Sequence, residues 1–122
     1  MTAAKRPKKV LIAEDNPDSA EIVTLLLEAE GHEVRVAYDG LSALQSAQEF
    51  KPDIAIIDIG LPGLNGYEVG QRLHKAMPDL ILIALTGWRV QRGDTRATKA
   101  GFHHYLNKPF EPAALSRLVD EL

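Results

Sequence analysis

Short apolar segments recur along the chain at intervals that fit an alternation of strands and helices. Five segments have the length and the apolar content of strands, and they read KVLIAED, EVRVAYD, DIAIIDI, LILIALTG and HHYLNKP. Continuous Val/Ile/Leu runs of this kind are typical of parallel strands covered by helices on both faces. The pattern therefore predicts a single series of five strands, each followed by a helix.

Between these segments, apolar residues recur at spacings of three and four, which indicates amphipathic helices. The clearest sets are Ile22, Leu25, Leu26 and Ala29; Val69, Leu73, Ala76 and Met77; and Leu115, Leu118, Val119 and Leu122. Asn16 as the cap and Pro17 at the first helical position mark the start of the first helix. Residues 40–50 and 90–100 have weaker helical patterns and are expected to be helices mainly from their positions in the series.

Right-handed crossovers arrange such a series as a three-layer sandwich. The expected fold is α/β and flavodoxin-like: a doubly wound, five-stranded parallel sheet in a (βα)5 sandwich. Residues 1–8 are expected to form a flexible basic arm, and residues 9–122 to form one domain. The pattern contains no repeat and no linker that would indicate a second domain.

Composition and charge narrow the classes of function. The chain has 122 residues, of which 45% are hydrophobic and 25% charged, with a net charge of -3. This balance offers no general affinity for nucleic acid or membranes, so neither direct nucleic-acid binding nor membrane insertion is expected. The longest apolar run, LILIAL, has six residues, whereas a membrane-spanning helix needs roughly 20. With no cysteine there is no disulfide or thiolate metal site, and a cytoplasmic location is expected.

Charged or hydroxyl-bearing residues stand at the ends of four predicted strands. They are Glu14 and Asp15 at the first, Asp58 at the third, Thr86 at the fourth and Lys108 at the fifth. In a doubly wound sheet, ligands bind in the crevice outside the carboxyl ends of the strands. Singly, each residue could be a helix cap or a turn residue. Together, at one edge, they indicate a binding site.

The charges in this cluster predict a bound divalent cation. Three carboxylates at close range repel one another, and some of them would have to take up protons. Oxygen donors with no cysteine and no clustered histidine favour Mg²⁺, or Mn²⁺, over zinc. The cation and Lys108 bring the site close to neutrality, so that a phosphoryl group can approach. Asp58 then has the nucleophilic carboxylate that forms aspartyl phosphates.

With these residues in place, the chain resembles the receiver domain of two-component response regulators over essentially its whole length. The matching segments are VLIAEDN, DIAIIDIGLPGLNGYEV, ALTG and YLNKPF. The resemblance implies that Asp58 is the phosphoacceptor and that Glu14 and Asp15 bind the metal ion. It also implies that the backbone carbonyl of Gly60 is a metal ligand. Gly60 departs from many receivers, which carry a side chain facing the site at that position.

The resemblance further implies roles around the phosphoryl group. Thr86 and Lys108 would contact its oxygens, assisted by the backbone N–H groups of Ile59 and Gly87. Tyr105 stands where receivers have a switch aromatic, which turns inward when the threonine is drawn to the phosphoryl group. The open alternative is a tyrosine that is merely half-buried on an edge strand. The bond from Lys108 to Pro109 is expected to be cis.

The resemblance also implies partners. Receivers take the phosphoryl group from a histidine kinase or a histidine phosphotransfer protein, catalyse this transfer themselves and hydrolyse the product, so the chain is not expected to be an enzyme with a separate substrate. A downstream protein would bind through the fourth helix, the fifth strand and the fifth helix. A basic stripe, Arg89, Arg92, Arg96 and Lys99, would line one face of that fourth helix. The stripe could meet an acidic partner or be a solvated face, and Trp88 could shield the site, meet a partner or lie on its own loop.

Other functions are less consistent with the residues. A flavin mononucleotide binder holds phosphate with backbone N–H groups after the first strand, where AEDNPDS would repel it. A haloacid-dehalogenase type of phosphatase has a second acid two residues after its nucleophile, where this chain has Gly60. An interaction module that does not depend on phosphorylation remains as an alternative. The chain could be a stand-alone receiver or part of a hybrid sensor kinase.

Overall fold

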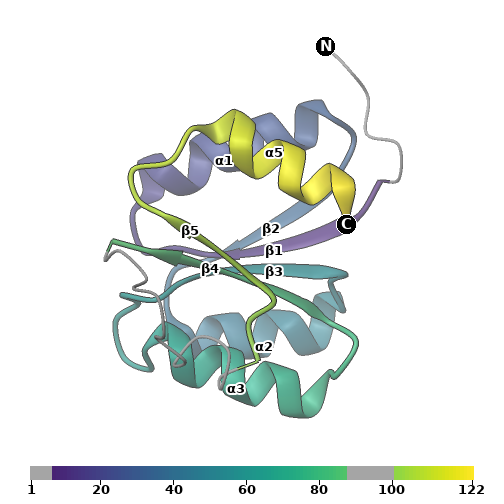
Figure 1. The fold of residues 1–122 in the computed structure, drawn as a ribbon. Helices are drawn as coiled ribbons and strands as arrows, with labels where there is room; N and C mark the ends of the chain where they lie inside the picture. Colours follow the sequence, from purple (N-terminus) through teal and green to yellow (C-terminus); the bar gives the residue numbers. More distant parts are fainter. Residues whose placement is uncertain (1–6, 88–100) are drawn as a thin grey trace.

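The computed structural model of the chain describes residues 7–87 and 101–122, which form a parallel sheet flanked by helices (Figure 1). The strands are β1 (Lys9–Ala13), β2 (Glu33–Ala37), β3 (Ile54–Asp58), β4 (Ile81–Thr86) and β5 (His104–Asn107). The helices are α1 (Pro17–Ala29), α2 (Gly40–Phe50), α3 (Gly66–Ala76) and α5 (Pro112–Glu121). The strand order is β2-β1-β3-β4-β5, with every neighbouring pair parallel.

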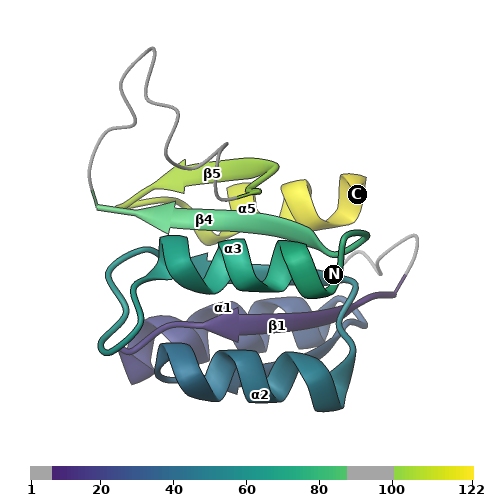
Figure 2. The same cartoon turned by 90° about the horizontal axis from the view of Figure 1, so that it is seen from below.

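The helices lie in two layers. α1 and α5 cover one face of the sheet, and α2 and α3 cover the other (Figures 1 and 2). Each face has its own apolar core, and the sheet contributes alternate residues to the two cores. The predicted doubly wound, three-layer fold is therefore confirmed. The helix expected at residues 90–100 lies outside the described residues.

Burial along the strands follows their place in the sheet. Every residue of the central strand β3 is buried, whereas the edge strands β2 and β5 alternate between more and less exposed residues. Full burial explains the uninterrupted apolar run before Asp58, because both faces of that strand are covered. Only its last residue is charged, and it lies at the open carboxyl end.

The first helix begins as predicted, but the apolar set identified from its spacing is not its buried face. The Asn16 side chain accepts hydrogen bonds from the backbone N–H groups of Asp18 and Ser19, and Pro17 is the first helical residue. The buried residues of α1 are Ala20, Val23 and Leu27, whereas Ile22 and Leu25 are 55% and 60% exposed. Three consecutive leucines, at residues 25–27, fit the apolar spacing of two different helical faces. Spacing alone therefore does not identify which face is buried.

The other helices match their predicted patterns more closely. α2 has the predicted bounds, with Asp39 as its cap. In α3, Val69 and Leu73 are buried, and in α5, Leu115 and Val119 are buried.

Several expectations concern residues outside the described part. Trp88 and the basic stripe belong to these, as do residues 1–6 of the expected N-terminal arm.

β1 begins at Lys9, at the predicted start of the domain. Among the described residues, no helix has the length and apolar character needed to cross a membrane.

Candidate functional site

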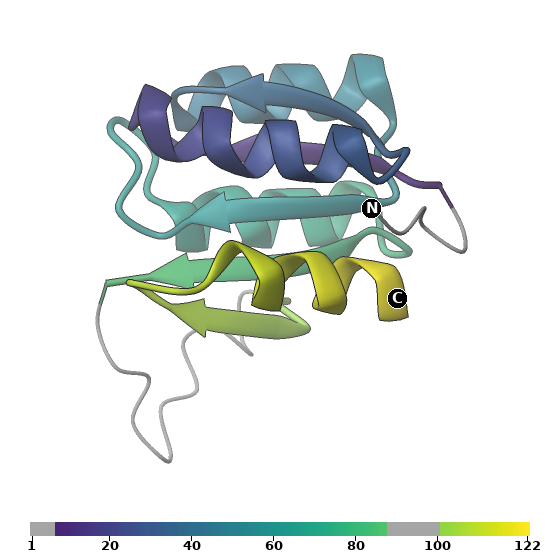
Figure 3. The same ribbon diagram turned by 90° about the horizontal axis from the view of Figure 1, so that it is seen from above.

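The carboxyl ends of the parallel strands lie at one edge of the sheet, as the common direction of the arrows in Figure 3 shows. Glu14 directly follows β1, Asp58 and Thr86 are the last residues of β3 and β4, and Lys108 directly follows β5. Main-chain hydrogen bonds extend the sheet into this region. The N–H of Glu14 donates to the Ala37 carbonyl, and the N–H of Lys108 donates to the Thr86 carbonyl at 2.7 Å.

The Lys108 side chain joins two of the predicted acids. Its Nζ lies 2.8 Å from Oε1 of Glu14 and 3.0 Å from Oδ2 of Asp58. These partners are 94 and 50 residues away in the sequence, so only the fold brings them together. The bond from Lys108 to Pro109 is cis, as expected.

The three predicted metal-binding acids also come together. Glu14, Asp15 and Asp58 each offer a carboxylate oxygen, and these three oxygens lie within 4.8 Å of one another. Glu14 and Asp58 are buried, with 2% and 7% exposure, whereas Asp15 is exposed. The cluster therefore has a buried side within the sheet and an open side towards solvent.

Burial and the neighbouring charges perturb the pKa of Glu14. Burial, together with the nearby Asp58 carboxylate, raises the pKa of Glu14 from 4.5 to about 7, although Lys108 acts in the opposite direction. This is the conflict predicted for three close carboxylates, because one of them holds a proton near neutral pH.

Asp58 and Lys108 remain charged. Burial alone would raise the pKa of Asp58, but neighbouring Glu14, the Gly60 N–H and Lys108 outweigh it and lower that pKa. Burial alone would lower the pKa of Lys108, but its hydrogen bonds to Glu14 and Asp58 raise it. The site therefore pairs an ionised Asp58 with an ammonium group.

The donor set fits a hard divalent cation. All three acids supply oxygen, which Mg²⁺ and Mn²⁺ prefer. In addition, Oε2 of Glu14 is buried and has no hydrogen-bond partner within the described structure. An unpaired buried carboxylate oxygen is costly, and a cation would satisfy it.

The backbone after Asp58 differs from expectation in one respect. The Ile59 N–H, which was expected to contact the phosphoryl group, donates to the Leu85 carbonyl at 2.9 Å and so extends the sheet. The Gly60 N–H instead donates to Oδ1 of Asp58 at 3.0 Å. The structure thus favours Gly60 over Ile59 as the backbone donor at the carboxylate.

Gly60 also leaves one side of the carboxylate uncovered. A Cβ atom at this position would lie 3.7 Å from Oδ1 of Asp58, which is an ordinary contact distance. A side chain would therefore fit next to the Asp58 carboxylate.

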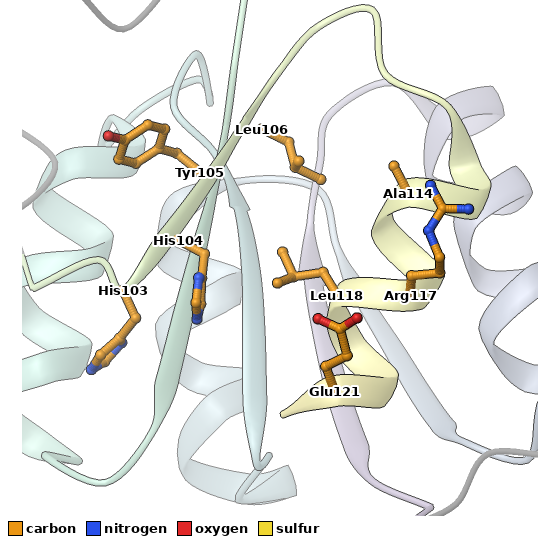
Figure 4. Close-up of a pocket in the computed structure, with 8 residues that line it drawn as sticks. All are labelled: His103, His104, Tyr105, Leu106, Ala114, Arg117, Leu118 and Glu121. Carbon is orange, nitrogen blue, oxygen red and sulfur yellow. The ribbon is translucent and has the colours of Figure 1, made fainter. Parts of the chain in front are cut away.

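Thr86 and Tyr105, the predicted switch pair, lie on neighbouring strands. Thr86 is buried at the end of β4, whereas Tyr105 on β5 is 48% exposed. In the β4–β5 register, Tyr105 pairs with Ala84 and Thr86 pairs with Asn107. Figure 4 shows the Tyr105 side chain pointing away from α5. The tyrosine is thus in an outward orientation in this structure.

An apolar cleft of about 400 Å³ adjoins the acids, and spacing alone did not reveal it. It shares Glu14 and Lys108 with the site, and its other lining residues are Ser19, Ile22, Val23, Pro109, Phe110 and Pro112. The cleft therefore joins the first helix to the segment that follows β5. Its wall includes Ile22, an exposed member of the apolar set identified in the first helix.

The family model for the response regulator receiver domain matches residues 10–120. The chain belongs to this family. Receiver domains are signalling domains of two-component systems, and response regulators interact with histidine kinases and downstream effectors. Phosphorylation and Mg²⁺ are typical of the family. The resemblance inferred from the sequence motifs is thus confirmed.

Similar proteins are known from several organisms. The DNA-binding response regulator MtrA of Mycolicibacterium smegmatis is 32% identical over 108 residues, which cover 88% of this chain and 47% of MtrA. An uncharacterised 14.6 kDa protein of Leptolyngbya boryana is 32% identical over 114 residues, covering 92% of this chain and 87% of that protein.

Solved structures agree with the fold. A CheY-like receiver domain protein from Methanospirillum hungatei has a TM-score of 0.88 and 28% identity, with 95% of this chain and 93% of the other covered. The response regulator TrrA of Thermotoga maritima, solved with Mg²⁺ and a beryllium fluoride, has a TM-score of 0.83 and 30% identity. That match covers 93% of this chain and 97% of TrrA.

The relatives also limit one expectation. This receiver chain spans about half the length of MtrA, which is described as DNA-binding. The expectation that the chain contacts no nucleic acid directly is therefore not confirmed.

Proposed function

We propose that this receiver domain is a phosphorylation switch in which Asp58 accepts a phosphoryl group from a phosphohistidine of a kinase or phosphotransfer protein. The observation that carries the proposal is the Lys108 ammonium, which is hydrogen-bonded to both Asp58 and Glu14. Together with Glu14 and the Gly60 N–H, this contact lowers the pKa of Asp58 and keeps it ionised and therefore nucleophilic, at the edge where ligands bind in such sheets.

In the proposed reaction, a carboxylate oxygen of Asp58 attacks the phosphorus atom of phosphohistidine. The P–N bond breaks, its electron pair stays on the imidazole nitrogen, and that nitrogen takes a proton from water. The product is an acyl phosphate on Asp58. Its later hydrolysis, in which water attacks phosphorus, returns the carboxylate and releases orthophosphate, so the domain resets itself.

Glu14, Asp15 and Asp58 would hold a Mg²⁺ or Mn²⁺ ion, with the Gly60 carbonyl as a further ligand. Their oxygens lie close enough to share one ion. When bound, the ion neutralises charge on the carboxylates and on the incoming phosphoryl group. Glu14 must give up its proton to serve as a ligand.

The phosphoryl oxygens would be held by this chain's own donors. Lys108 supplies an ammonium group, Thr86 a hydroxyl, and Gly60 and Gly87 supply backbone N–H groups. Preorganised donors of this kind stabilise the charge of a transferring phosphoryl group without reorganising at the moment of reaction. The position of Lys108 beside Asp58 supports this assignment most directly.

Phosphorylation would reach the surface through Thr86 and Tyr105. Attraction of the Thr86 hydroxyl to the phosphoryl group would open space behind it, and the Tyr105 ring would turn inward to fill that space. The outward, half-exposed Tyr105 supports this proposal, because it leaves the ring free to take a second position.

The downstream partner would bind beside this tyrosine. β5 and α5 border a groove of about 520 Å³. Figure 4 shows His104 and Leu106 of β5 on one side of this groove, and Leu118, Arg117 and Glu121 of α5 on the other. Apolar and charged groups together suit a protein partner, and the net charge of -3 supports a protein rather than a nucleic acid.

The phosphodonor would approach over the cleft between α1 and Phe110. The cleft shares Glu14 and Lys108 with the site, so a side chain seated in it would lie next to the acceptor. Exposed Ile22 and Leu25 offer apolar contact area for a protein donor. A small donor such as acetyl phosphate does not need this surface.

Intact-mass spectrometry after incubation with acetyl phosphate tests the proposal. With Mg²⁺ the protein is expected to gain one labile phosphoryl group, and with EDTA it is expected to gain none. If neither acetyl phosphate nor a phosphorylated histidine protein labels it, the proposal fails, and the interaction module that does not need phosphorylation becomes the favoured alternative.

A further inference from the structure

The loop between β3 and α3, residues 59–65, carries the backbone atoms that lie beside Asp58. At its start, the Gly60 N–H donates to the Asp58 carboxylate. At its end, the N–H of Gly66 donates to the Ile59 carbonyl at 3.0 Å. The loop therefore folds back towards its own origin. Gly60 and Leu64 therefore belong to one short backbone segment whose two ends are hydrogen-bonded together.

A residue of another helix contacts the middle of this loop. Gly40, the first residue of α2, lies so close to Leu64 that a Cβ atom on Gly40 would be 2.6 Å from the Leu64 carbonyl oxygen. The same atom would be 2.7 Å from the Leu64 Cβ and 3.0 Å from a methyl carbon of Val69. Two of these three contacts involve the loop backbone or its first side-chain atom. They cannot be relieved by rotating a flexible side chain.

The start of α2 is held by its cap, whereas Leu64 of the loop is only partly buried. Asp39 caps α2, with its carboxylate accepting from the N–H of Ser42 at 2.8 Å, so the start of the helix is fixed. Leu64 packs against the core between the sheet and the α2–α3 layer. A methyl group at Gly40 would therefore push the loop rather than the helix.

We propose that Gly40 is a positioning residue for the phosphorylation site. Its missing side chain lets the loop 59–65 settle against α2, and this contact fixes Gly60 relative to Asp58. The proposal rests on the proposed function, because Gly60 matters there as a metal ligand and phosphoryl donor. Gly40 itself lies in α2 and would act on the site through Leu64.

A purely structural role for Gly40 makes a different prediction. In that case Gly40→Ala would lower the melting temperature and leave the folded site unchanged. Gly70 in α3 provides a matched control, since the three atoms nearest to a Cβ atom there all belong to the ring of Phe102, the closest at 2.4 Å. Gly70→Ala therefore introduces a comparable clash away from the site.

The experiment compares wild type, Gly40→Ala and Gly70→Ala at a temperature well below every melting transition. Titration calorimetry gives the Mg²⁺ affinity, hydrogen exchange gives the protection of residues 59–65, and acetyl phosphate gives the labelling rate. For Gly40→Ala, Mg²⁺ affinity is expected to fall about tenfold, as for other changes behind metal ligands. Loop exchange is expected to be faster and labelling slower. Gly70→Ala is expected to match wild type in all three while melting at a lower temperature.

Leu64→Ala provides a second test if Gly40→Ala does not fold. Leu64 is only partly buried, and its truncation frees the loop from the core without adding a clash. The same weakening of Mg²⁺ binding is expected. The proposal is overturned if a folded Gly40→Ala, or Leu64→Ala in its place, binds Mg²⁺ and is labelled like wild type. If wild type itself neither binds Mg²⁺ nor is labelled, the proposed function fails instead.

Discussion

The Lys108 ammonium lies between two carboxylates, 2.8 Å from Glu14 and 3.0 Å from Asp58. It occupies one oxygen of each acid, on residues that would also ligate a cation. In the proposed reaction Lys108 would therefore have two opposing effects, because it would assist an incoming phosphoryl group and would compete with the metal ion. The two effects can be separated by substitution.

Lys108→Met removes the charge and keeps much of the side-chain volume. Labelling of Asp58 by acetyl phosphate is expected to slow by about 100-fold, as for the loss of one donor to a developing charge. Mg²⁺ binding is expected to become tighter, because the competing cation is gone. Calorimetry and a labelling time course measure the two quantities. Equal labelling rates in variant and wild type would exclude a role for Lys108 in transfer.

The raised pKa of Glu14 predicts how the affinity for Mg²⁺ depends on pH. Its pKa of about 7 lies above the ordinary value of 4.5, so the folded protein holds this proton more tightly than the unfolded chain does. Mg²⁺ affinity is expected to fall by about tenfold per unit as pH drops from 7 towards 5, since each ion must displace one proton. Above pH 7 the affinity is expected to level off. Calorimetry across this range measures the slope.

Glu14→Gln is the control for this titration, because it is expected to weaken Mg²⁺ binding and to flatten the dependence of the affinity on pH.

The raised pKa of Glu14 also predicts how the stability of the metal-free protein depends on pH. Protonated Glu14 stabilises the fold fully below pH 4.5, and this contribution is lost as pH rises through about 7. In EDTA at pH 8, thermal unfolding is therefore expected at a higher temperature for Glu14→Gln than for wild type. A lower melting temperature for the variant would contradict the raised pKa.

Because Gly60 has no side chain beside Asp58, we expect a phosphoryl group on Asp58 to be short-lived. A side chain at this position fits beside Asp58, since its Cβ would lie 3.7 Å from the carboxylate oxygen. Gly60→Leu is expected to shield the acyl phosphate from water and to lengthen its half-life severalfold. Decay of the labelled mass after removal of the donor measures this half-life. An unchanged decay would mean that water reaches the phosphorus from another side.

A substitution at Ile22 is expected to affect the rate of phosphoryl transfer differently for protein donors and for small-molecule donors. Ile22→Lys places a charge in the apolar wall of the cleft, at a side chain that is already 55% exposed. Transfer from a phosphorylated histidine phosphotransfer protein is expected to slow by about tenfold, a typical effect of losing one well-placed apolar contact. Labelling by acetyl phosphate is expected to stay at the wild-type rate. Equal slowing with both donors would indicate damage to the site itself.

The sequence predicts the sheet and the cluster of site residues because both depend on local signals. Buried parallel strands appear as uninterrupted apolar runs, and residues that end such strands must share one edge. These two rules are enough to place Glu14, Asp58, Thr86 and Lys108 in one cluster. The cap at Asn16 and the bounds of α2 follow from equally local patterns.

Contacts that depend on three-dimensional packing could not be predicted in this way. The three leucines of α1 fit either helical face, and only packing against the sheet identifies Leu27 as the inner one. The Ile59 N–H donates a hydrogen bond to the Leu85 carbonyl of β4. The close contact between Gly40 and Leu64 joins two segments that share no sequence pattern. These three features depend on how elements distant in the sequence pack together in the fold.

The most direct test of the central claim is to locate the phosphoryl group on the chain. Wild type and Asp58→Asn are incubated with Mg²⁺ and acetyl phosphate, treated with borohydride to reduce any acyl phosphate, and mapped by peptide mass spectrometry. The account predicts homoserine at position 58 in wild type and no labelled peptide in the variant. Labelling at another residue, or equal labelling of both proteins, would contradict it.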